Sequence, residues 1–161
     1  NDDVGNYGVL ERPLRWSSKR VNTYYTERFL ALAADHGIAV FWVMPIVSPS
    51  LQERREQMGL DAQYASFVSD MQAKHPNLTV IDGRRSSFER SVFIDPVHLD
   101  QRGASILSAK LAAVVRDRRP GFVRDPSWVE LPSFRNLLAE QGAEDLPSSQ
   151  AALHLDGGTR R

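Results

Sequence analysis

The residues of this chain best suited to chemistry are Asp95 and His98, which lie three positions apart around Pro96. A carboxylate at this spacing can accept a hydrogen bond from Nδ1 of the imidazole, and that bond fixes the tautomer of the ring. The second ring nitrogen, Nε2, is then free to take a proton from a hydroxyl nucleophile. The pair is therefore typical of the acid and base of a Ser-His-Asp triad.

The same spacing also has a structural interpretation. Asp95 can bond the backbone N–H groups of a turn, and His98 can pack on the start of the next helix. Asp82 ends an apolar run, where it is a candidate substrate-binding carboxylate but more typical of a cap on the following turn. Trp16 is a candidate for the wall of a sugar or acyl pocket, or for a surface anchor.

The remaining candidates favour structural roles. Neither Ser48 nor Ser50 lies in a Gly-x-Ser-x-Gly turn, and Ser50 and Glu53 have capping-box spacing, which predicts a helix start. Metal binding is not favoured because the other histidines lack the spacing of paired ligands. These histidines are His36, His75 and His154.

Composition narrows the classes of protein. Of 161 residues, 42% are apolar and 25% charged, which is ordinary for one globular domain. Twenty basic residues balance 20 acidic ones, so no net charge favours nucleic acid or an anionic membrane. With no cysteine, disulfides and thiol catalysis are excluded. No run reaches the roughly 18 apolar residues of a membrane span.

The hydrophobic pattern predicts alternating helices and strands. A helix is expected over residues 21–36, with Val21, Tyr25, Phe29 and Leu32 on its apolar face, followed by a strand at 38–44 buried on both faces. Helices interrupted at Gly59 lead to a strand at 78–82. Asp100 is then expected to cap the last core helix. This order predicts an α/β fold with a parallel sheet, whose functional groups gather at the carboxyl ends of the strands.

Two strands are too few to bury these helices, since an open sheet usually has four or five. The polar start, which lacks a signal peptide, suggests a piece of a longer protein, and we expect the missing strands upstream or on another chain. Residues 1–119 are expected to form the domain. Residues 120–161 are expected to form a partly ordered or disordered tail that packs through Trp128 and Phe134.

Residues 93–104, with the sequence Phe-Ile-Asp-Pro-Val-His-Leu-Asp-Gln-Arg-Gly-Ala, resemble the last sequence block of SGNH (GDSL-type) hydrolases. In that family an Asp-x-x-His-Leu precedes the terminal helix. The resemblance makes Asp95 the triad acid, His98 the general base and Gly103 the small residue that begins this helix. The order of elements over residues 21–115 is also similar to the C-terminal half of the family. It implies a three-layer, flavodoxin-like parallel sheet, incomplete in this chain.

The resemblance implies an esterase that removes acyl groups from a small-molecule or carbohydrate ester without a cofactor. The chain contains no Gly-Asp-Ser, so the nucleophilic serine is expected outside it, and the chain alone is expected to be nearly inactive. Asn1 matches the edge of the Gly-x-Asn-Asp block, which implies an oxyanion donor. A polysaccharide O-acetyltransferase and a non-catalytic binding module of the same fold are the alternatives. Such proteins are often exported, but the compartment and the oligomeric state stay open.

Overall fold

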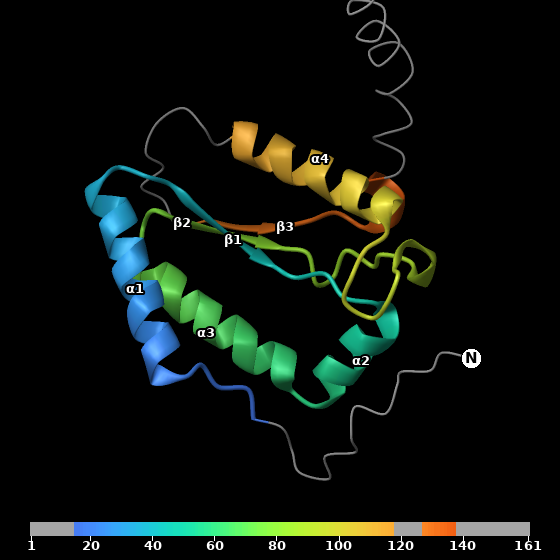
Figure 1. The fold of residues 1–161 in the computed structure, drawn as a ribbon, viewed down its shortest axis with the longest axis horizontal. Helices are drawn as coiled ribbons and strands as arrows, with labels where there is room; N and C mark the ends of the chain where they lie inside the picture. Colours follow the sequence, from blue (N-terminus) through green and yellow to red (C-terminus); the bar gives the residue numbers. More distant parts are fainter. Residues whose placement is uncertain (1–14, 118–126, 138–161) are drawn as a thin grey trace, which may run out of the picture.

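The computed structural model describes residues 15–117 and 127–137, which form an α/β fold around a parallel sheet (Figure 1). In chain order the elements are α1 (Arg20–Asp35), β1 (Val40–Met44), α2 (Pro49–Gln57), α3 (Leu60–Lys74), β2 (Leu78–Asp82), the 3-10 helix η1 (Arg90–Val92), α4 (Gln101–Asp117) and β3 (Ser127–Glu130). The predicted α/β class with a parallel sheet is confirmed. None of the helices in the described ranges has the length and apolar character of a membrane span.

The three described strands are parallel in the order β1-β2-β3. All five residues of β2 are buried because the strand has a neighbour on each side and helices on both faces. In β1 only Met44 is buried. The prediction of a strand buried on both faces is therefore wrong for residues 38–44, which contribute a strand beginning at Val40 that lies at the edge of the described sheet.

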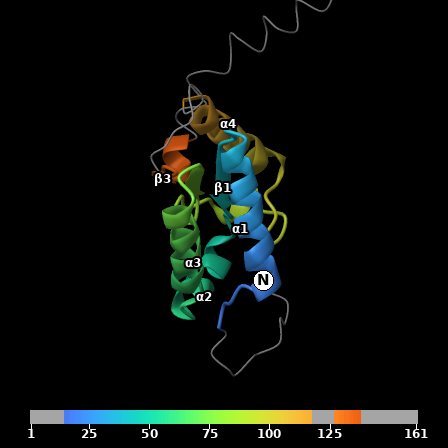
Figure 2. The same cartoon turned by 90° about the vertical axis from the view of Figure 1, so that its left-hand side faces the viewer.

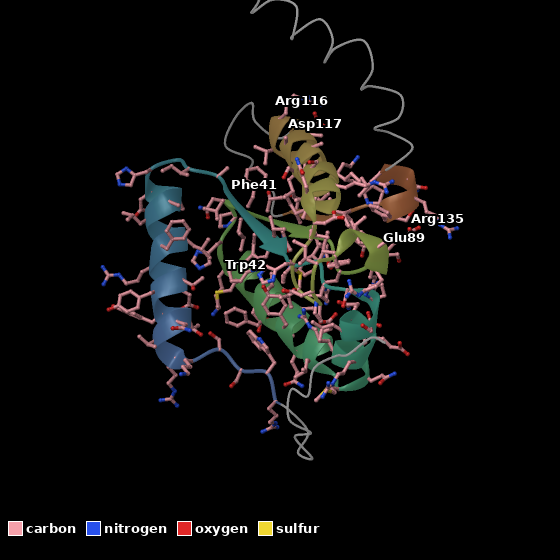
Figure 3. The ribbon with its side chains drawn as sticks, turned by 45° about the vertical axis from the view of Figure 1, so that its right-hand side comes forward. Phe41, Trp42, Glu89, Arg116, Asp117 and Arg135 are labelled. Carbon is pink, nitrogen blue, oxygen red and sulfur yellow. The ribbon has the colours of Figure 1, made fainter. Side chains whose placement is uncertain are left out.

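Helices cover both faces of the sheet, which gives three layers (Figure 2). Val80 of β2 points into a core shared with α1 and α3, whereas its neighbour Ile81 points into a core under α4. The same alternation places Phe41 of β1 on the α4 side and Trp42 on the α3 side (Figure 3). The period of two along each strand thus divides the apolar residues between the two cores.

The predicted apolar face of α1 is wrong. The helix buries Leu30 and Ala33, while the residues expected to face the core are more than half exposed. Those exposed residues are Val21, Tyr25, Phe29 and Leu32. Leu30 packs in the core that also contains Val68 and Met71 of α3. The helix has an apolar arc wider than the described sheet covers, so spacing alone does not identify the buried part.

The structure adds a third strand, which the sequence pattern did not predict. Trp128 of β3 donates its indole N–H to Asp82 Oδ2 at 3.2 Å. Phe134 is almost fully buried, and its ring centroid lies 4.7 Å from that of Phe88. The expected packing through Trp128 and Phe134 is thus confirmed, but residues 127–137 also supply an edge strand of the described sheet and part of the core under α4.

Local signals at the helix ends are partly confirmed. Gly59 adopts the left-handed conformation between α2 and α3 with φ of 69°, which glycine allows without steric cost. The predicted capping box is wrong, because α2 begins at Pro49 and places Ser50 inside the helix. Ser48 occupies the N-cap position without a side-chain cap, and proline at the first helical position fixes the start.

Candidate active site

A closed loop between η1 and α4 carries both predicted catalytic residues. Phe93 and Leu99 form an antiparallel bridge across its base, and Ile94 N–H donates to the carbonyl of His98 at 2.9 Å. At the far side of the loop, the carbonyl of Pro96 accepts the backbone N–H of Ser48 at 2.9 Å. Since Ser48 follows β1, this bond holds the loop at the carboxyl end of the parallel sheet.

The start of α4 fixes the other end of this loop. Asp100 Oδ1 accepts the N–H of Gly103 at 2.7 Å, which confirms the cap expected from the sequence. A Cβ at Gly103 would lie 2.9 Å from the carbonyl oxygen of Val92, so only glycine lets α4 approach η1 this closely. The small residue at the helix start therefore sets the position of the loop that precedes it.

Asp95 makes both kinds of hydrogen bond considered for it. Its Oδ1 accepts the N–H groups of Val97 and His98, each at 2.8 Å. Its Oδ2 lies 2.7 Å from His98 Nδ1. The turn-capping and imidazole-binding interpretations are thus compatible, because each carboxylate oxygen serves one of them.

The environment of Asp95 strongly favours the ionised form of its carboxyl group. The hydrogen bond from the His98 side chain, followed by that from the Val97 backbone, lowers the pKa of Asp95 to about 2. The carboxylate is therefore ionised near neutral pH. An ionised carboxylate on Nδ1 favours the tautomer that carries its proton there and leaves Nε2 as the basic nitrogen.

The imidazole of His98 is open to solvent. Side-chain exposure is 72% for His98 and 45% for Asp95. In the described part of the chain, the ring is hydrogen-bonded to Asp95 alone, and no serine hydroxyl contacts Nε2. The adjacent Ile94 and Val97 are also exposed, at 71% and 51%. The imidazole thus lies on an accessible surface, in a loop that also exposes two apolar side chains.

A cavity of about 440 Å³ opens between α2 and the segment that follows β2. It is lined by Ile46, Val47, Pro49, Gln52, Glu53, Glu56, Arg84, Arg85, Ser87, Phe88 and Glu89. Val47 and Pro49 flank Ser48, whose N–H donates to the carbonyl of Pro96, so the cavity adjoins the loop that carries Asp95 and His98. Ser87 has a φ of 52°, a conformation that few non-glycine residues adopt. A cavity lined by apolar and charged side chains at this edge of the sheet can hold part of a small ligand.

Arg84 joins this cavity to a buried network of charges. Its guanidinium contacts both carboxylate oxygens of Asp82, at 2.9 and 2.6 Å, and donates to the backbone carbonyl of Asp61 at 3.2 Å. Arg55 Nε lies 3.0 Å from Asp61 Oδ1. Burial raises the pKa of Asp82, but the bonds from Arg84 outweigh it, and the net pKa is lowered. Two carboxylates thus balance two guanidinium groups.

Asp82 also accepts the backbone N–H of Arg84 at 3.1 Å, so it caps the turn after β2, as the structural interpretation expected. The contact between Arg84 and Asp61 was not predicted from the sequence. The adjacent arginines 84 and 85 resemble a solvated basic patch, and Asp61 is far away in sequence. The one signal in the sequence was the basic residue Arg84, which lies two positions after Asp82 at the end of a strand.

The other sequence candidates lie apart from the imidazole or outside the described residues. Asn1 is among the latter, and so is His154. Trp16 packs against Tyr64 and Phe67 of α3, with ring centroids 5.2 and 5.0 Å away, which supports the anchor interpretation. Within residues 15–117 and 127–137, no group of three or more acidic or histidine side chains is arranged to hold a metal ion.

The fold and this site define an α/β protein with an Asp-His pair at the carboxyl edge of a parallel sheet. No family model, no curated protein and no solved structure matches the chain.

Proposed function

We propose that this chain contributes the acid and base of an ester hydrolase, with Asp95 orienting His98. The observation that carries the proposal is the 2.7 Å contact between Asp95 Oδ2 and His98 Nδ1 beneath an exposed ring. The resemblance of residues 93–104 to SGNH hydrolases supports the same roles. In this proposal the nucleophile is a serine that lies outside this chain.

In the proposed reaction, the serine hydroxyl attacks the ester carbonyl and its proton passes to His98 Nε2. The imidazolium is stabilised by the ionised Asp95 and returns the proton to the leaving alcohol as the C–O bond breaks. Water then attacks the acyl-serine with His98 again as the base, which releases the acid and restores the serine. Backbone N–H groups and an asparagine, for which Asn1 is the proposed residue, bind the oxyanion.

Two features support a small-molecule or carbohydrate ester as the substrate. The loop that carries His98 also exposes Ile94 and Val97, and exposed apolar side chains suit a short acyl group. The adjoining cavity carries the carboxylates of Glu53, Glu56 and Glu89, whose oxygens can accept hydrogen bonds from hydroxyl groups. An acyl group on a polyhydroxylated alcohol would thus meet apolar and polar surfaces on its two sides.

The test is hydrolysis of p-nitrophenyl acetate and an acetylated oligosaccharide by the complete protein as its gene encodes it. His98→Ala is expected to lower kcat by about 10⁴ or more, as triad deletions do. His36→Ala, at the exposed end of α1, is the control and should retain activity. Equal activity of the His98 variant and the parent would refute the proposal. An acetyl donor with a glycan acceptor distinguishes transfer from hydrolysis.

A further inference from the structure

A second cavity, of about 280 Å³, continues the cavity between α2 and the segment that follows β2. The two cavities have lining residues in common, so they are adjoining parts of one groove, which we call the α2 groove. The residues that line both cavities are Gln52, Glu56, Arg84 and Arg85. The second cavity extends to the start of α3, which lies beside α2 (Figure 1), where the small side chains of Ala62 and Ala65 line it.

Hydrogen bonds fix the side chains where the two cavities meet. Gln52 Nε2 donates to Glu56 Oε1 at 2.8 Å and also to Asp61 Oδ2. Arg84 is held at the same place by the carboxylate of Asp82 and by the backbone carbonyl of Asp61. These side chains already have their partners before a ligand arrives. A groove whose side chains are fixed in this way loses little conformational freedom on binding.

The groups that remain available to a ligand include both hydrogen-bond donors and acceptors. In the part of the chain that the structure describes, the guanidinium of Arg85 takes part in no ion pair and no hydrogen bond, so its N–H groups can donate to a ligand. Glu53 and Glu56 each accept from a glutamine through Oε1, which leaves Oε2 as an acceptor. Hydroxyl groups can both accept from the guanidinium and donate to the carboxylates, whereas a charged ligand would be repelled by one or the other.

We infer that the α2 groove binds a neutral sugar chain of more than one residue. The esterified residue lies in the first cavity, which adjoins the loop of Asp95 and His98, and the chain continues into the second cavity toward Ala62. The first cavity alone has the volume of a small-molecule site, so the second serves the part of the ligand beyond the ester. The place of the ester rests on the proposed function, but binding of the sugar chain needs no catalysis.

Isothermal titration calorimetry of the complete protein with unesterified neutral sugars tests the inference. The probes are xylotetraose, cellotetraose and tetra-N-acetylchitotetraose, each compared with its own monosaccharide. At least one tetrasaccharide is expected to bind at least tenfold more tightly than its monosaccharide, because only the longer ligand reaches the second cavity. Equal affinities for chain and monosaccharide would overturn the inference, and so would a failure of all three tetrasaccharides to bind.

Ala62→Trp places the gain in affinity within the groove. Ala62 is exposed and lines the second cavity but not the first, so an indole there fills only the second. The variant is expected to lose the tenfold preference for the tetrasaccharide and to keep the affinity for the monosaccharide. Ala73→Trp, also exposed on α3 but outside both cavities, is the matched control and should bind like the parent. Undiminished tetrasaccharide binding by Ala62→Trp would contradict the inference.

Hydrolysis separates the inference from the proposed function. If the parent binds the tetrasaccharide but releases no acetate from its acetylated form, the proposed function fails and the sugar-binding groove stands. If the acetylated monosaccharide and the acetylated tetrasaccharide are hydrolysed with equal kcat/KM, the proposed function stands and the inference fails. We expect kcat/KM to be at least tenfold higher for the tetrasaccharide, and Ala62→Trp to remove this difference without slowing hydrolysis of p-nitrophenyl acetate.

Discussion

One carboxylate oxygen of Asp95 binds backbone N–H groups, and the other binds the side chain of His98. Oδ1 accepts the N–H groups of Val97 and His98, while Oδ2 lies 2.7 Å from Nδ1 of the imidazole. The carboxylate is thus held rigidly by the loop it helps to close. Rigid support of this kind is what an orienting residue of a catalytic pair requires.

This arrangement predicts an unusual titration of Asp95. Its carboxyl carbon, followed by NMR, is expected to titrate at about 2, and His98→Ala should move the midpoint up toward the ordinary 3.8. The rise stays incomplete because the backbone N–H groups remain. Since the folded pKa is depressed, the stability that this carboxylate contributes is present above about pH 4. It is lost as the pH falls through 2. A midpoint of 3.8 that is the same in the parent and in His98→Ala would contradict the hydrogen bond between Asp95 and His98.

Replacement of Arg84 by alanine is expected to destabilise the fold by about 3 to 5 kcal/mol, because it leaves Asp82 buried without its cation. Urea unfolding measures the change. Arg116→Ala is the matched control, since Arg116 and Asp117 form an exposed pair on α4 (Figure 3). The control should change the free energy of unfolding by less than about 1 kcal/mol. Similar small losses in both variants would show that the buried network contributes little.

Phe134→Ala tests whether the segment after α4 belongs to the domain. Phe134 is 1% exposed and packs on Phe88, so its truncation is expected to cost about 3 to 5 kcal/mol of unfolding free energy. Arg135→Ala, at the exposed next position, is the control and should change little. If Phe134→Ala proved as mild as its control, residues 127–137 would form a tail rather than part of the core.

The strand β2 was predictable to the residue because the short run Leu-Thr-Val-Ile is apolar or β-branched and Asp82 ends it, and the fold buries all five residues. The pair Asp95 and His98 was predictable because its geometry is local and needs only one loop. The cap that Asp100 forms on α4 was predictable for the same reason, because it bonds a backbone N–H only three residues away.

What sequence alone did not predict depends on partners distant in the chain. The strand β3 is only four residues long, and it is fixed by contacts such as Trp128 with Asp82 across 46 positions. The buried side of α1 depends on how far the sheet extends beneath it, which no helical period encodes. Arg84 looks like a surface charge until Asp61 and Asp82 lie beside it.

The most direct measurement is trapping of the nucleophile in the complete protein with a fluorophosphonate, which modifies serines activated by a neighbouring base. The parent protein and His36→Ala are expected to label at a single serine, detected by mass spectrometry. His98→Ala should lose the label while keeping the same fold by circular dichroism. Labelling of the His98 variant at the parent's rate would contradict a catalytic role for the imidazole, and so would a parent that never labels.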